Sequence, residues 1–481
     1  MSLCIYNTNS YLLFHRLIKR IIHILFMGIS IAMFCCPPYC HYGSGHRVHS
    51  QIGIILFAHI LKERLSRAGI HYGWVMVTIA FLATVFSSAV GSVPQILILP
   101  MIKEFGWNIS DVSMATALMY FILASLCPFG AALMLRIGVV KVVLLSIMLN
   151  ALGLLLTVLA FEKWHLLVSI GVCLGIAAGI IGLGLASTIA IRWFNLKRGL
   201  VVGILTSAFA AGQLVFVPFM AWITTVYDWR FAVLPAMIGI GICGILYLFF
   251  GRDWPADLNL PAYGDTDIYQ PPALSSDNVV LISLSNLMTA SKQPAFWILA
   301  GTFFICGLTS TGIIGQHFIP FCGDNNVGIV LASSYLALMG VFNFIGTMGS
   351  GWLSDRFDNY KLLGVYYALR GVSLVYLPFS DFGVMAMTLW AIFFGLDFIA
   401  TVPPTVRLIG KQFGTVSAPV VFGWVFAAHQ FGSAAAAYGA GYSRDALFSY
   451  APAFLIAGAA CFSATAMIMS FIMFAPKKLH E

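Results

Sequence analysis

The fold is decided by a short loop with the sequence Gly349-Ser350-Gly351-Trp352-Leu353-Ser354-Asp355-Arg356-Phe357-Asp358-Asn359-Tyr360-Lys361. This charged loop separates two long apolar segments, in a chain of 481 residues of which 60% are hydrophobic and only 9% are charged. A soluble globular protein carries about 25% charged residues. So few charges, spread over so many apolar runs, indicate a protein that crosses a membrane many times.

Twelve apolar segments are each long enough to cross a hydrocarbon core of about 30 Å. They comprise residues 73–101, 112–135, 139–161, 165–192, 199–226, 230–250, 295–318, 329–353, 362–379, 383–408, 418–442 and 451–474. We therefore predict an all-α polytopic membrane protein with twelve transmembrane helices.

The segments fall into two groups of six, separated by one long polar stretch. Residues 251–293 contain four prolines and five aspartates, which is typical of a linker. We expect a six-helix half over 71–250, a cytoplasmic linker over 251–293, a second half over 294–475 and a cytoplasmic tail over 476–481. The halves also repeat weakly, because Arg136 and Lys141 match Arg356 and Lys361 at a constant spacing.

Residues 1–70 differ from the rest of the chain and are expected to form an extension that is poorly ordered or interfacial. The apolar run over 21–36 follows several basic residues and is shorter than the roughly 20 residues of a spanning helix, so it resembles a signal-type segment. Residues 51–65 are compatible with a helix that lies in the membrane interface.

The distribution of basic residues predicts the orientation of the chain. One set of loops contains sixteen Lys and Arg residues, whereas the other set contains only Lys103, Lys163, Arg230 and Arg444. The positive-inside rule places the richer set in the cytoplasm, with both ends of the helical region. The net charge of +8 is explained by these loops, so we expect no nucleic-acid partner.

The opening loop resembles the loop motif of the major facilitator superfamily, which combines a Gly, an Asp-Arg pair and a basic end. Further stretches resemble the monocarboxylate-porter branch of that family and related bacterial members. These are Tyr72-Gly73-Trp74, Trp193-Phe194-Asn195-Leu196-Lys197-Arg198-Gly199-Leu200-Val201-Val202-Gly203 and Gly395-Leu396-Asp397-Phe398-Ile399-Ala400-Thr401-Val402-Pro403-Pro404-Thr405. The resemblance implies two six-helix halves that rock around a central site.

The chain departs from this resemblance at two positions. Leu135 stands where the first-half loop of the family has an Asp. The porters carry an Asp and an Arg in the eighth helix; Asn343 stands near the position of the Asp, and nothing stands for the Arg. These departures put a monocarboxylate substrate in question.

Two formal charges lie deep within the predicted spans, Arg370 and Asp397. Counting about 1.5 Å per residue from Lys361 and from Arg407, they lie about 13 Å and about 15 Å inside. Charges within a bilayer are costly and are usually paired. We therefore expect an ion pair, with Asp397 nearer the substrate; the alternative is a purely structural pair.

Other polar residues within the spans are candidates for the solute or proton cavity. Histidine titrates near physiological pH, so His317 and His429 are candidates for proton transfer. The neutral candidates are Tyr120, Gln213, Asn343 and Gln430, which are equally compatible with hydrogen bonding between helices.

We expect a secondary active transporter in the plasma membrane (the inner membrane of a bacterium) that moves a small organic solute by alternating access. The first guess is an organic anion such as a monocarboxylate, moved with a proton. The alternatives are a proton-driven exporter of amphipathic or cationic compounds and a transporter-like sensor. No motif indicates a metal, a nucleotide or a catalytic cluster, so we expect no cofactor, no enzymatic activity and a monomer.

The opening loop also predicts a gate at the cytoplasmic face. In the superfamily fold this loop lies beside the start of the fifth helix, which here carries Lys197 and Arg198. Asp355 would meet these cations and the positive end of the helix dipole. Arg356 and Lys361 complete the predicted gate, which rests mainly on Asp355 because Leu135 weakens the first-half counterpart.

Overall fold

The structure is a computed structural model that describes residues 49–182, 184–268 and 279–474. Within these ranges the regular structure is helical, and the one β pairing is an isolated bridge between Phe194 and Tyr263. Twelve helical segments are long and apolar enough to cross a membrane, which confirms the predicted all-α class. The apolar run over 21–36 lies outside the described residues.

Each half of the chain contributes six spans. The first half contains α3 (Gly73–Phe105), α4 (Ile109–Ile137), α5 (Val139–Val158), a fourth span made of α6 (Lys163–Leu166), η1 (Leu167–Leu174), α7 (Gly175–Ile181) and α8 (Gly184–Trp193), then α9 (Arg198–Val226) and α10 (Trp229–Ala232) with α11 (Leu234–Phe250). The second half contains α13 (Pro294–Gly307), η3 (Leu308–Ile314) and α14 (Gly315–Asp324) as one span, then α15 (Ile329–Ser354), α16 (Asn359–Tyr376) with η4 (Leu377–Phe379), α17 (Val384–Asp397), α18 (Val402–Leu447) and α19 (Ala451–Phe474).

The observed spans agree with the predicted ones in number and order. The seventh and tenth are longer than predicted, because they continue to Asp324 and Gly414. Proline in these segments does not end the helix: Pro320 lies within α14. Helix α18 joins the end of the tenth span to the eleventh across a kink at Gly414, whose φ of 75° is the left-handed conformation that glycine adopts readily.

Small residues let the helices approach closely within each half. A Cβ atom added at Gly175 of α7 would lie 3.0 Å from the Met119 carbonyl oxygen of α4. In the second half, a Cβ at Gly307 would lie 1.8 Å from the His429 carbonyl oxygen, and one at Gly346 would lie 1.9 Å from the Leu396 carbonyl oxygen. Such contacts are the usual means by which transmembrane helices pack, since lipid provides no hydrophobic force between them.

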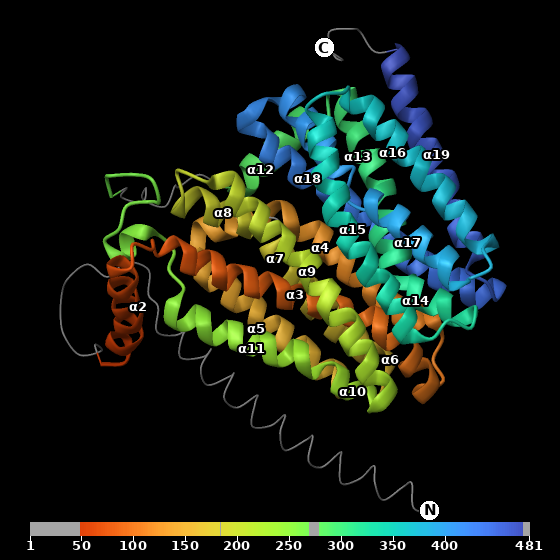
Figure 1. Cartoon of the computed structure of the whole chain (residues 1–481), viewed down its shortest axis with the longest axis horizontal. Helices are drawn as coiled ribbons and strands as arrows, with labels where there is room; N and C mark the ends of the chain where they lie inside the picture. The colour runs from red at the N-terminus through yellow and green to blue at the C-terminus, as the bar shows by residue number, and fades with distance from the viewer. Residues whose placement is uncertain (1–48, 183, 269–278, 475–481) are drawn as a thin grey trace, which may run out of the picture.

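The most extensive contacts between the two halves in the described chain are those of α4 with α18, α9 with α15, and α3 with α14. Figure 1 shows the first half in red to green beside the second half in cyan to blue. We call the end of the bundle that carries the linker the linker face and the opposite end the far face. Helix α4 begins at the far face, and α9 begins at the linker face.

The linker docks on the first half by backbone hydrogen bonds. The Tyr263 amide donates to the Trp193 carbonyl over 2.8 Å, and the Asn195 amide donates to the Tyr263 carbonyl over 2.9 Å. Asp253 accepts from the Val140 amide over 3.0 Å, at the first turn of α5. The Asp253 carboxylate therefore bonds the backbone at the first-half loop. That loop has Leu135 where the family motif has an Asp.

Within the described chain, α2 (His49–Arg67), α12 (Val279–Ala290) and the short 3-10 helix η2 (Pro255–Leu258) lie outside the twelve spans. Helix α2 contacts α11 and lies across the bundle end rather than alongside the spans, with Phe57 packed edge-on against Phe249 (Figure 1). The interfacial placement expected for residues 51–65 stays a prediction. Helix α12 contacts both α4 and α18, and Trp424 donates to its Ser283 carbonyl.

Candidate functional site

The two deep charges form the ion pair that their matched depths predict. Arg370 of α16 donates from Nε to Asp397 Oδ2 of α17 over 2.5 Å. The Arg370 side chain is fully buried and that of Asp397 is 9% exposed. A buried pair is tolerated only when further hydrogen bonds satisfy its remaining donors and acceptors.

Arg370 has its hydrogen-bonding capacity filled. A guanidinium has five N–H donors. Besides the bond to the Asp397 carboxylate, Arg370 donates to the Asp397 and Phe398 carbonyls over 2.6 and 3.2 Å, to the Cys306 thiol over 3.0 Å and to the Thr309 hydroxyl over 3.4 Å. A substrate carboxylate therefore meets no vacant donor on Arg370 while the pair is intact.

The tenth span is broken directly after Asp397. Helix α17 ends at Asp397 and α18 begins at Val402. Pro403 and Pro404 follow, and proline has no N–H to bond the carbonyl four residues earlier. Discontinuous helices occur at the sites of secondary transporters because their free backbone groups are satisfied there by side chains or ligands.

Two side chains of one neighbouring span, α15, bond the backbone of this break. Ser350 of α15 donates to the Ala400 carbonyl over 2.5 Å, and Asn343 Oδ1 accepts from the Ile399 amide over 3.1 Å. Asn343 was a candidate cavity residue, and the structure shows its amide oxygen engaged by the broken helix. The break was missed from the sequence, although the Pro403-Pro404 pair is a signal for it.

His429 lies beside the ion pair, whereas His317 does not. The backbone carbonyl of His429 packs against Gly307, and the neighbouring Cys306 thiol receives a hydrogen bond from Arg370. The Nδ1 of His429 is buried and has no partner among the described residues. His317 is fully buried, with Nε2 2.7 Å from the Ala437 carbonyl and Nδ1 3.3 Å from the Tyr450 hydroxyl. These bonds fit a packing residue.

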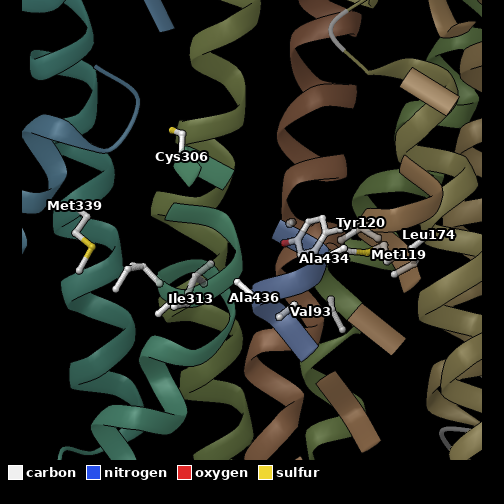
Figure 2. Close-up of a cluster of buried hydrophobic side chains, with 14 of the residues drawn as sticks. Val93, Met119, Tyr120, Leu174, Cys306, Ile313, Met339, Ala434 and Ala436 are labelled. Atoms are coloured by element: carbon white, nitrogen blue, oxygen red, sulfur yellow. The ribbon is translucent and has the colours of Figure 1, made fainter. Parts of the chain in front are cut away.

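The three remaining neutral candidates occupy different surroundings. Gln316 of α14 donates to the Tyr120 hydroxyl of α4 over 2.7 Å, which is a direct bond between the halves. Figure 2 shows Tyr120 close to Ala434 of α18. Gln430 is buried, and its Oε1 has no partner within the described chain. Gln213 of α9 is half-buried.

The predicted gate is not formed in this structure. Asp355 pairs with Arg407 of its own half, and Arg356 stacks on Trp352 with 3.9 Å between the guanidinium carbon and the ring centre. On the other half, Lys197 lies over the Tyr263 ring, while Arg198 donates to the Phe194 carbonyl. In the described chain no ion pair or hydrogen bond joins Asp355 to these two cations. Asp358 caps α16 through the Lys361 amide.

The two halves contact each other at the far face, whereas glycines of α9 and α15 at the linker face have free space beside them. Side chains added at Gly199 and Gly203 of α9, or at Gly349 and Gly351 of α15, would meet nothing within 4 Å. At the far face a Cβ at Gly323 would lie 3.3 Å from Leu99 across the two halves.

Comparison with known proteins identifies the family. Residues 80–437, well over half of the chain, match the family model described as Major Facilitator Superfamily. The chain belongs to this superfamily of membrane transporters, which confirms the family suggested by the opening loop.

Curated relatives are similar at low identity. The chain is 28% identical over 267 residues to "Uncharacterized MFS-type transporter YcxA" of Bacillus subtilis (strain 168), a match that spans 54% of this chain and 60% of that protein. It is 24% identical over 396 residues to "Monocarboxylate transporter 13" of Rattus norvegicus, spanning 81% of this chain and 86% of the relative. It is 26% identical over 309 residues to "Monocarboxylate transporter 11" of Homo sapiens, spanning 63% and 61%.

Among solved structures, the chain resembles a bacterial homologue of the human lysosomal transporter Spinster, described as inward-facing and unoccupied. The TM-score is 0.58 at 14% identity, and the match covers 84% of this chain and 95% of that chain. At this identity the likeness shows the fold alone. The twelve spans in two six-helix halves are those of the superfamily.

Proposed function

We propose that this protein is a secondary active transporter in the plasma membrane, or the inner membrane of a bacterium, that moves a small organic solute by alternating access. The observation that carries the proposal is the buried Arg370–Asp397 pair at the break between α17 and α18. A buried charge pair costs free energy unless it is well satisfied, and ionisable groups within a membrane mark ion or substrate pathways.

Proton coupling follows from the chemistry of this pair. Asp397 Oδ1 is buried and has no partner in the described chain, so a proton can bind there without displacing an existing hydrogen bond. Protonation would remove the charge that holds Arg370 Nε, and the guanidinium would then have a donor for an anion. An organic anion such as a monocarboxylate, moved together with a proton, is the proposed substrate, and the names of the relatives support it.

The proposed orientation places the linker face in the cytoplasm, where the positive-inside rule puts the basic loops. In this orientation the contacts between the halves at the far face would close the outside, and we propose that the structure represents a state accessible from the cytoplasm. The predicted contact of Asp355 with Lys197 and Arg198 remains part of the proposal, as a gate that forms when the cytoplasmic side closes.

A second candidate function is proton-driven export of amphipathic or cationic compounds. All the N–H donors of Arg370 are engaged in hydrogen bonds, whereas Asp397 Oδ1 has no partner in the described chain. This arrangement favours a cationic substrate, since Oδ1 is then the charged atom of the pair that is left to bind it. A cation would compete with the proton for this oxygen.

The experiment that tests the proposal is uptake by proteoliposomes containing the purified protein. Candidate organic acids, amines and amino acids are first selected by thermal shift at two pH values. A stabilising acid whose uptake is driven by an inward proton gradient supports proton symport. Stabilisation only by lipophilic cations, with proton-driven efflux, would support export. No gradient-driven movement of any stabilising compound would rule out transport of these classes.

A further inference from the structure

We propose that a polar stripe on α4, formed by Ser113, Thr116 and Tyr120, lines the solute pathway when the far face opens, and that Asp445 of α18 latches that face shut. The inference rests on the proposed transport function. It assigns a new set of solute-contacting residues, whose hydroxyl groups suit an uncharged hydrogen-bonding group such as a hydroxyl or an un-ionised carboxyl.

The three side chains share one face of α4. Their spacing of three and four residues places them one turn apart on the same side of a helix. Ser113 faces α18, because a Cβ at Gly441 would lie 2.7 Å from its hydroxyl oxygen. Tyr120 faces α14, whose Gln316 it contacts. Thr116 lies between them, so the whole stripe faces the second half.

The stripe is buried in this state and its hydrogen bonds are incomplete. Ser113 and Thr116 are each 1% exposed, and neither hydroxyl has a partner in the described part of the chain. Gln316 Oε1, at the end of the stripe, is also buried and unpartnered. Buried polar groups without partners are rare in native proteins and each costs free energy. Opening the far face would give all three oxygens water or solute, which explains why polar residues occupy this interface.

Asp445 closes the outer end of the same interface. Its two carboxylate oxygens accept from the Ile109 and Ser110 amides over 3.2 and 2.7 Å. These amides begin α4 and have no partner within their own helix, so the carboxylate of one half caps a helix of the other half. The positive end of the helix dipole adds to this attraction. The cap must break before the far face can open.

Accessibility of residue 116 tests the pathway. Thr116→Cys in the full chain is treated from the far side with a membrane-impermeant thiol reagent, and fragment mass spectra distinguish a label on residue 116 from one on a native cysteine such as Cys127 of the same helix. Labelling is expected to be slow in the single variant. It should rise by at least about tenfold with Asp445→Asn, the effect of losing one charge-assisted hydrogen bond. Asp381→Asn is the control, because Asp381 caps only its own loop.

A steric wedge provides a second way to open the face. Gly441→Val places a side chain against Ser113, whereas at Gly439 an added Cβ meets nothing within 4 Å. Gly441→Val should therefore speed labelling of Thr116→Cys, and Gly439→Val should leave it unchanged. The inference is overturned if residue 116 remains unlabelled in the wedge variant while uptake persists. Faster labelling without uptake of any solute would instead contradict the proposed function alone.

A solute-binding role is separated from a structural one by Thr116→Val. The Thr116 hydroxyl makes no bond in this state, so its removal should leave the thermal stability unchanged or higher. If the solute contacts the hydroxyl, KM should rise by about three- to tenfold, the effect of one neutral hydrogen bond. Thr157→Val is the matched control. Thr157 is also buried, but its hydroxyl, unlike that of Thr116, already makes a hydrogen bond, to the Gly153 carbonyl. Loss of stability at Thr116 with KM unchanged would contradict the inference.

Discussion

Arg370 and Asp397 are joined twice, since the guanidinium of Arg370 donates both to the carboxylate of Asp397 over 2.5 Å and to its backbone carbonyl over 2.6 Å. The second bond is possible because α17 ends at Asp397, whose carbonyl accepts from the Ala400 amide over 3.2 Å and not from an amide four residues on. The ion pair and the helix break therefore depend on each other, and substitutions can test both.

Removing one member of the pair should destabilise the protein more than removing both. Arg370→Met leaves a buried, uncompensated carboxylate, which typically costs about 3–5 kcal/mol. The double variant Arg370→Met with Asp397→Leu removes both charges and should recover most of that loss. Thermal unfolding in detergent measures the difference. A destabilisation of the double variant equal to the sum of those of the two single variants would show that the charges do not depend on each other.

Asp397→Asn should abolish the dependence of uptake on the proton gradient. The amide keeps the size of the side chain but cannot take up a proton at physiological pH. Proteoliposome uptake is compared with and without an inward proton gradient, and Asp267→Asn in the linker serves as the control. Proton-dependent uptake that survives Asp397→Asn would exclude a functional role for this carboxylate and leave only a structural one.

Ser350→Ala should weaken the broken tenth span. The substitution leaves the Ala400 carbonyl without its 2.5 Å hydrogen bond in a buried place, at a cost of about 1–3 kcal/mol. Ser334→Ala is the matched control, because the exposed Ser334 bonds only a carbonyl of its own helix. Thermal unfolding of the two variants measures the cost. The same small effect at both positions would contradict the assigned role of Ser350.

The predicted gate should form when the linker face closes. Cysteines introduced together at Asp355 and Gly199 are expected to cross-link with a short bifunctional reagent, and the cross-link should stop uptake by trapping that face shut. Each single cysteine variant provides the control. Asp355→Ala alone should change stability by less than about 1 kcal/mol, because its pair with Arg407 is exposed. No cross-link in a transport-competent protein would refute the gate.

Docking of the linker should weaken at low pH through His71. Its Nε2 lies 3.0 Å from the Pro261 carbonyl and its Nδ1 accepts from the Gly73 amide, an arrangement that needs the neutral ring. Burial lowers the pKa of His71. The undocked state therefore binds the proton more tightly. Docking becomes less favourable as the pH falls below the ordinary histidine pKa of about 6.5.

Hydrogen exchange at the Tyr263 amide, corrected for the intrinsic effect of pH, measures this docking. Exchange at pH 5.5 is expected to exceed that at pH 7.5 in the natural chain. His71→Gln should remove the difference, since glutamine does not titrate. An unchanged pH effect in that variant would assign the titration to another group.

The sequence by itself determined the twelve spans, their division into two halves and the family. These properties depend on local composition, because each segment must satisfy its own backbone in lipid and so shows its length and polarity directly. The depths of Arg370 and Asp397 also followed from the sequence, since the rise per residue of a helix is fixed. The short motifs around Asp355 and Lys197 located the two loops of the predicted gate.

Only the tertiary structure decided which polar groups meet. These contacts join segments that are distant in the chain. Asn343 and Ser350 bond the backbone of the broken tenth span, Asp445 caps α4, and Asp355 pairs with Arg407. Sequence spacing predicts which residues share a helix face, but it does not predict which face another helix presents. The alternating access that we propose would also change these contacts with the state of the molecule, so that one sequence would specify more than one set of them.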